Sequence, residues 1–151
     1  MFQMKRKSTP YPKGGESPDT DSDSVLREPA AEYIVHRVRD GLAMGEFQYL
    51  RELLGLSEER LAGLLLMSRA TLHRRKKAGA LDRAESDRLV RFGRLFRRAV
   101  AVLGSEDAAR GWLSEPAFAF GGEPPLDYAD TEAGAREVEA LLGRIEHGVF
   151  S

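Results

Sequence analysis

Apolar residues recur at intervals of three and four from about residue 31 to the end of this sequence, and this spacing constrains the fold more than any other feature. Such intervals place side chains on one face of an α-helix, whereas a half-buried β-strand alternates apolar and polar residues. No alternating run is visible along the chain. The sequence therefore predicts an all-α fold.

Residues suited to the ends of helices divide this periodic region. Small polar residues whose side-chain oxygens can accept hydrogen bonds from a first helical turn are the predicted N-caps. They are Ser57, Ser68, Asp82, Ser105 and, before the last helix, Asp130 or Thr131. Glycines that favour helix ends follow at Gly55, Gly79, Gly104 and Gly148. Residues 115–131 are rich in Pro, Gly and aromatic residues, and we expect an ordered loop that buries Phe118, Phe120 and Tyr128.

The formal net charge of −1 hides an uneven distribution of charge. Residues 57–104 contain twelve Lys or Arg and five Asp or Glu, a net charge of +7. Residues 105–151 contain three Lys or Arg and ten Asp or Glu, a net charge of −7. Two neighbouring segments of opposite charge suggest two different partners. The partner of the basic segment is expected to be a polyanion.

Two short predicted helices within the basic segment have the spacing of a helix-turn-helix. Ala62 is small where the helices cross, and the apolar residues that hold them together are Leu61, Leu65, Met67 and Leu72. The second helix then turns a basic face outward. We expect its DNA contacts from Arg69 and Arg74 to base edges, from Ser68, Arg75, Lys76 and Lys77 to phosphates, and from His73. In the turn, Leu66 stands where glycine is usual, so either the turn is shifted by one residue or the motif has drifted.

A seam of apolar residues marks the helix predicted to begin after Asp82. Leu89, Phe92 and Phe96 follow one another at intervals of three and four. Such a seam packs against another helix, either in the core of the same chain or in a second copy as a dimerisation contact.

The residue types give little support to catalysis, metal binding or membrane insertion. The chain has no cysteine and only three histidines, His36, His73 and His147, which stand far apart and not at the spacing of metal ligands. No phosphate-binding glycine loop or nucleophile motif is visible, so we expect no enzyme activity, no catalytic residue and no cofactor. Without a secretory signal or an apolar run of about 18 residues, we expect a cytoplasmic protein that does not bind membranes.

The C-terminal two thirds of the chain resemble a known family. Three segments are similar to the Xre/MbcA/ParS family of antitoxins: TLHRRKKAGALDRAESDRLVR, AVLGSEDAARGWL and GGEPPLDYADTEAGAREVEALLGRIEHGVF. The resemblance covers residues 44–151. Its most specific positions are Gly122, Pro125, Leu126, Thr131, Gly134, Val138, Leu142, Arg144, Ile145 and Gly148. Pro124 departs from the family, which usually has threonine there.

The resemblance implies an Xre-like helix-turn-helix bundle followed by a small helical toxin-binding module. We therefore expect a DNA-binding and dimerisation region over residues 25–104 and a toxin-binding module over 105–151. Residues 1–24 are rich in Lys, Pro, Gly, Ser and Asp with little to bury, and this composition predicts a disordered tail. The family implies the antitoxin of a type II toxin–antitoxin pair, a homodimer that represses its own operon by binding operator DNA. Its partner is a RES-domain toxin that consumes NAD⁺, and the antitoxin's C-terminal end covers the entrance to the toxin's active site. Carried over to this chain, that role falls on Arg144, Glu146, His147, Gly148, Val149, Phe150 and Ser151.

The negative charge of residues 105–151 motivates a hypothesis about that end: with its free carboxylate it mimics the anionic substrate at a basic active-site entrance. Two alternatives stay open for the whole chain. One is a free-standing helix-turn-helix transcription factor without a toxin partner, and the other is an adaptor that has lost DNA binding, which Leu66 favours. A neighbouring gene that encodes an enzyme toxic on its own favours the antitoxin, and a lone gene favours the transcription factor. Operator affinity that is unchanged when Arg69 and Arg74 are replaced by alanine favours the adaptor.

Overall fold

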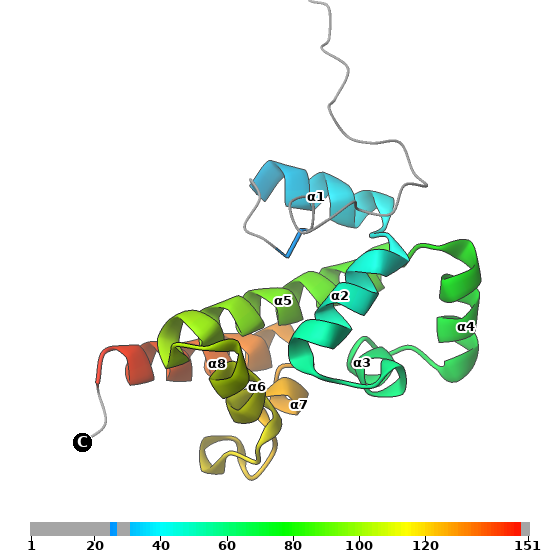
Figure 1. Cartoon of the computed structure of the whole chain (residues 1–151). Coiled ribbons are helices and arrows are strands. Elements are labelled where there is room, and N and C mark those ends of the chain that lie inside the picture. The colour runs from blue at the N-terminus through cyan, green and yellow to red at the C-terminus, as the bar shows by residue number, and fades with distance from the viewer. Residues whose placement is uncertain (1–24, 27–30, 149–151) are drawn as a thin grey trace, which may run out of the picture.

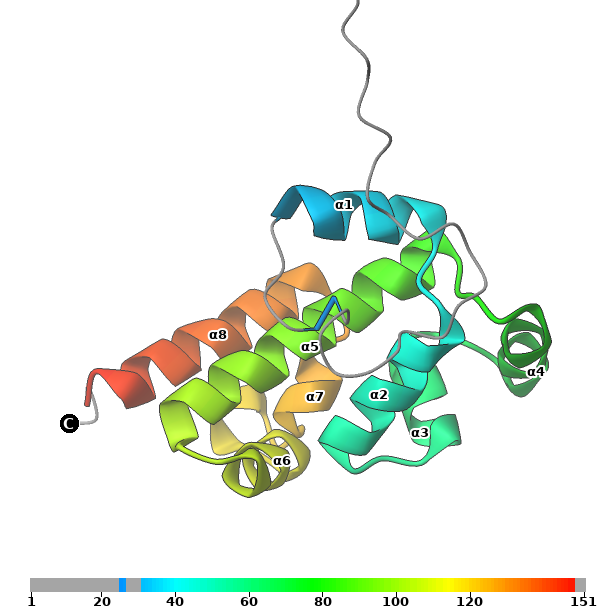
Figure 2. The same ribbon diagram turned by 45° about the horizontal axis from the view of Figure 1, so that its top comes forward.

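The computed structural model describes residues 25–26 and 31–148. Its longest helix, α5 (Arg83–Leu103), runs through the middle of the molecule, with α1 (Ala31–Asp40) across one side and α8 (Glu132–Glu146) along another (Figures 1 and 2). Over the described residues there is no strand, and only an isolated bridge joins Ala43 to Ala80. The predicted all-α fold is confirmed.

The remaining helices lie at the two ends of α5. Near its beginning are α2 (Met44–Leu54), α3 (Glu58–Leu64) and α4 (Arg69–Ala78), with α4 at the edge of the molecule (Figure 1). Beyond its end, α6 (Glu106–Ser114), a 3₁₀ turn η1 (Phe118–Phe120) and α7 (Pro125–Tyr128) lead into α8. The helices α5 and α8 run parallel to each other, so arginines and glutamates at matching positions can meet.

The predicted N-caps form as local chemistry requires. Each accepts a hydrogen bond from the backbone N–H three residues ahead: Ser57 from Arg60, Ser68 from Thr71, Asp82 from Glu85, Ser105 from Ala108, and Thr131, not Asp130, from Gly134. At Asp82 the Glu85 carboxylate also accepts from the Asp82 N–H at 2.9 Å, which completes a capping box. α2, α4 and α5 end at Gly55, Gly79 and Gly104 as predicted.

One buried cluster joins both ends of the molecule. α5 contributes to it from several faces, and the cluster includes Leu50 of α2 as well as Val138 and Leu142 of α8, all fully buried. The division at residue 104 therefore separates two stretches of chain that share a core. α1 is less firmly held: none of its residues is buried, and Val35 is 44% exposed.

The apolar seam of α5 lies inside the chain. Leu89 and Phe92 are 0% exposed and Phe96 is 3% exposed, which agrees with core packing. Side chains so completely covered by their own chain have no surface left for a second copy. The assignment of these three residues to dimerisation is therefore not supported, and a homodimer, if it forms, needs other residues.

The loop predicted over residues 115–131 is ordered, but it contains η1 and α7. Phe120 is buried and its ring stacks on Tyr128 with centroids 4.5 Å apart. Phe118, by contrast, is fully exposed, so the prediction that it is buried is wrong. A 3₁₀ helix turns about 120° per residue, so Phe118 and Phe120 point in different directions, and Phe120 is the one that points inward.

Candidate functional site

The turn between α3 and α4 is not shifted along the sequence, and Leu66 occupies the position where glycine is usual. Leu66 adopts a φ of 60°, the left-handed conformation, and is 64% exposed. Its N–H donates to the Gly63 carbonyl at 3.0 Å, and the Met67 N–H donates to the Ala62 carbonyl at 2.8 Å. The left-handed position thus falls on Leu66 itself, so the alternative of a turn shifted by one residue is wrong.

The contact between α3 and α4 is the one that the sequence predicted. The inward residues Leu61, Ala62, Leu65, Met67 and Leu72 are all buried. Because these side chains fix how α4 rotates about its axis, they also decide which of its residues face solvent.

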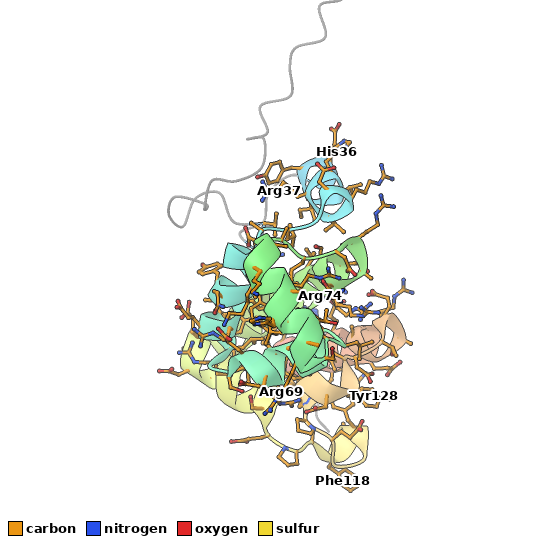
Figure 3. All side chains as sticks on the ribbon, turned by 90° about the vertical axis from the view of Figure 1, so that its right-hand side faces the viewer. His36, Arg37, Arg69, Arg74, Phe118 and Tyr128 are labelled. Atoms are coloured by element: carbon orange, nitrogen blue, oxygen red, sulfur yellow. The ribbon has the colours of Figure 1, made fainter. Side chains whose placement is uncertain are left out.

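The outer face of α4 is basic and exposed. Arg69, His73, Arg74 and Lys77 are all on the surface, and Figure 3 shows the labelled Arg69 and Arg74 on α4 as it faces the viewer. Among the described residues none of these four makes an ion pair. The first turn of α4 holds no acid, so nothing offsets the positive end of its helix dipole. Ser68 stands exposed at that end, where free N–H groups suit a phosphate.

Arg75, which the sequence assigned to phosphates, turns toward α5 instead. Its Nε lies 2.7 Å from Glu85 Oε1 and its Nη2 lies 3.1 Å from Asp82 Oδ2. The Glu85 side chain is only 7% exposed. The hydrogen bond to Glu85 is the largest of the influences that raise the pKa of Arg75 above its ordinary value. Arg75 therefore holds α4 onto the start of α5.

Lys76 also has an acidic partner within the chain. Its Nζ lies 2.9 Å from Glu58 Oε2, at the start of α3. The hydrogen bond from Lys76, with a second from Gln48, lowers the pKa of Glu58. Both partners are partly exposed, so Lys76 can exchange Glu58 for a phosphate more readily than Arg75 can leave Glu85.

Arginines of α5 pair with glutamates of α8 along the two parallel helices. The pairs are Arg91 with Glu132 at 3.2 Å, Arg94 with Glu132 at 3.2 Å and with Glu139 at 2.5 Å, and Arg98 with Glu146. A further pair joins Arg60 of α3 to Asp127 of α7 at 2.6 Å. The opposite charges of residues 57–104 and 105–151 thus partly neutralise each other within one molecule, and only the unpaired charges remain for partners.

Glu132 is the centre of this ion-pair row. Its partial burial alone would raise its pKa, but the neighbouring Arg94 and Arg91 guanidinium groups outweigh burial and hold the pKa of Glu132 below its ordinary value. The carboxylate is therefore charged at neutral pH and helps to fix α8 against α5.

The residues assigned to toxin binding lie at and beyond the end of α8. Arg144, His147 and Gly148 are exposed, whereas Glu146 is engaged by Arg98. Val149, Phe150 and Ser151 lie outside the described residues. The structure thus brings the exposed members together at one tip of the molecule, far along α8 from α4 (Figure 1).

The sequence did not reveal how closely α8 approaches α7. A Cβ on Gly134 would lie 1.8 Å from the Tyr128 carbonyl oxygen, so only glycine fits at this contact. The Thr131 hydroxyl accepts from the Gly134 N–H at 3.0 Å in the same turn. Both residues belong to the motif that carried the family resemblance, and their role is packing.

Known proteins match both halves of the chain. Residues 34–94 match the Antitoxin Xre-like helix-turn-helix domain, and residues 98–148 match the Antitoxin Xre/MbcA/ParS C-terminal toxin-binding domain. An Antitoxin Xre of Photorhabdus laumondii is 32% identical over 130 residues, which cover 85% of this chain and 80% of that protein. The chain belongs to the Xre/MbcA/ParS family of antitoxins.

Shorter matches to other antitoxins of this family agree. The Antitoxin Xre of Yersinia enterocolitica is 41% identical over 85 residues, 56% of this chain and 57% of that protein. The Antitoxin Xre of Pseudomonas putida is 39% identical over 64 residues, 42% of this chain and 40% of that protein. The matched segments thus span little more than half of the first of these proteins and less than half of the second.

Membership in an antitoxin family fits a regulatory protein. Within residues 25–26 and 31–148, no three His, Asp or Glu side chains gather as metal ligands would. None of the helices in this part combines the length and apolarity needed to cross a bilayer.

Proposed function

We propose that this antitoxin neutralises a RES-domain, NAD⁺-consuming toxin through its C-terminal module and represses its own operon through α4, as a cytoplasmic homodimer. One observation carries the proposal. The same helix, α5, packs against both an Xre-like helix-turn-helix, whose basic face is exposed, and an Xre/MbcA/ParS toxin-binding domain. The two partners are assigned to surfaces far apart on the molecule, so both can be bound at once.

For DNA, the structure supports a narrower set of contacts than the sequence suggested. Arg69 and Arg74 are free to reach base edges, and Ser68 and Lys77 to reach phosphates, with His73 beside them. Arg75 is excluded from this role by its pair with Glu85, and Lys76 contributes only if it leaves Glu58.

For the toxin, the C-terminal end beyond α8 covers the entrance to the active site. The exposed Arg144, His147 and Gly148 begin this surface, and residues 149–151 complete it. Because Arg98 pairs with Glu146, that acid of α8 is not available to mimic an anionic substrate. This refines the hypothesis that the negative net charge of residues 105–151 motivated.

The DNA half is tested by measuring operator affinity of the full chain over a series of salt concentrations. The double variant R69A/R74A should lose most of its affinity and show a shallower dependence on salt, because two cationic contacts are gone. R136A, which removes an exposed arginine on α8, serves as the matched control and should bind as the unchanged chain does. Equal affinity of R69A/R74A and the unchanged chain would favour an adaptor without DNA binding.

The toxin half is tested by co-expressing the chain with the adjacent gene and purifying through a tag on one protein. We expect a stable complex in which NAD⁺ consumption is suppressed, and deletion of residues 148–151 should restore NAD⁺ consumption. R69A/R74A should still neutralise the toxin. If the chain binds its operator but no co-encoded protein, it is a free-standing transcription factor.

A further inference from the structure

We infer that Phe118 is an anchor for the toxin, a second contact point separate from the C-terminal end, and that it inserts into an apolar pocket with a basic rim. This inference rests on the proposed function, since it needs a toxin to bind. Phe118 lies within residues 98–148, the part of the chain that matches the toxin-binding domain.

Phe118 is the most exposed large apolar side chain in the described part of the protein. Its exposure is 103%, against 64% for Leu66 and 44% for Val35. Figure 3 shows it at the extremity of the molecule, on the segment between α6 and α7. An aromatic ring held wholly in water gains nothing for folding, whereas such rings are enriched among the residues that dominate binding free energy at interfaces.

The loop holds Phe118 outward by a fixed backbone. The Ala117 carbonyl accepts from the N–H groups of Phe120 at 3.1 Å and Gly122 at 3.0 Å, and the Ala117 N–H donates to the Glu123 carbonyl at 3.1 Å. Gly121 and Gly122 take φ values of 65° and 88°, the left-handed region that allows this tight reversal.

The next aromatic residue secures the base of the same loop. Phe120 is buried and stacked on Tyr128 at an interplanar angle of 19°. Phe120 faces the core, and Phe118, two residues earlier in the same 3₁₀ turn, points in a different direction and lies in solvent. The ring is thus presented in advance of binding, which lowers the entropy lost when a partner closes over it.

The charge around the loop indicates the chemistry of the pocket. Most acids of α8 are neutralised by arginines of α5, but Glu115 and Glu123, on either side of the turn, are exposed and make no ion pair with any described residue. An apolar tip between two unpaired carboxylates fits a pocket lined by apolar side chains and edged by Lys or Arg. It disfavours DNA, whose phosphates the carboxylates would repel.

The test compares F118A with the unchanged full chain in three measurements: affinity for the co-purified toxin, affinity for the operator and thermal stability. We expect F118A to weaken toxin binding at least about tenfold, as loss of an interface anchor does, with operator affinity and stability unchanged. V35A removes an exposed apolar side chain outside residues 98–148, the part that matches the toxin-binding domain, and should leave toxin affinity unchanged. E115Q/E123Q should slow toxin association most clearly at low salt.

The outcomes separate this inference from the proposed function. If the unchanged chain binds no co-encoded protein, the proposed function fails and the inference falls with it. If the unchanged chain binds the toxin and F118A binds it equally well, only the inference is overturned. If F118A leaves toxin affinity intact but alters the sedimentation of the antitoxin alone, the loop pairs two copies and the inference is likewise overturned.

Discussion

Arg75 of α4 and Glu85 of α5 form an ion pair with Nε and Oε1 2.7 Å apart, and the carboxylate that takes part is almost completely buried. The same carboxylate accepts from the Asp82 N–H in the capping box at the start of α5. Arg75 belongs to a run of basic residues that the sequence assigned to DNA. Its ion pair with Glu85 instead fixes the position of α4 against α5.

Replacing Arg75 by alanine should lower the stability of the fold. The buried Glu85 carboxylate would lose its cationic partner, and an unsatisfied buried group costs about 1–3 kcal/mol. Urea unfolding of R75A should show this loss, whereas K77A, an exposed lysine on the same helix, should unfold as the unchanged chain does. Unchanged stability of R75A would mean that the pair contributes nothing to the fold.

Replacing Leu66 by glycine should stabilise the protein. An L-residue in the left-handed conformation is strained by about 1–2 kcal/mol, and glycine removes this strain at the expense of some unfolded-state entropy, so we expect a net gain of about 1 kcal/mol. L66A keeps the Cβ and therefore the strain, so it is the matched control and should show no gain. If L66A and L66G are equally stable, backbone strain is not the controlling factor.

Replacing Gly134 by alanine should destabilise the contact between α7 and α8. The added Cβ would meet the Tyr128 carbonyl oxygen at 1.8 Å, and overpacking against backbone costs about 1–3 kcal/mol. At Gly143, on the same helix, the nearest atom is Arg98 Nη2 at 4.0 Å, so alanine fits. G143A should be neutral or stabilising by up to about 1 kcal/mol through helix propensity. In thermal unfolding we expect G134A to lower the melting temperature and G143A to leave it unchanged or raise it.

Acid should weaken the ion-pair row between α5 and α8. The pKa of Glu132 is lowered below 4.5 in the folded chain, so its contribution to stability is complete above that pH and is lost as the pH falls through the lower folded-state value. E132Q should therefore be less stable than the unchanged chain at pH 7 and lose less stability on acidification. Unfolding measured from about pH 7 to about pH 3 tests this sign. E137Q, which removes an exposed acid of α8 that pairs with no described residue, should follow the unchanged chain.

Much of the helix pattern follows from local sequence. The N-caps at Ser57, Ser68 and Ser105 need only a side-chain oxygen and the N–H three residues ahead, so they form wherever the helix begins. The inward face of α4 likewise follows from the spacing of Met67 and Leu72, because a helix fixes the angle between side chains.

Other properties depended on partners distant in sequence. Helix packing decides whether Arg75 is free for DNA or pairs with Glu85. It also decides whether Arg98 stays in solvent or pairs with Glu146. No local sequence pattern contains that information. The spacing of Leu89 and Phe92 favoured core packing but left a dimer contact open, and the surrounding helices bury both side chains.

The sequence alone determined the all-helical class, most of the helix ends and the position of the helix-turn-helix, because these depend on periodicity and on hydrogen bonds within a few residues. Only the tertiary structure decided which charges stay available to partners and that Phe118 faces water while Phe120 is buried. Long-range packing makes those choices, since burial and ion pairing are relations between residues that the chain brings together only when it folds.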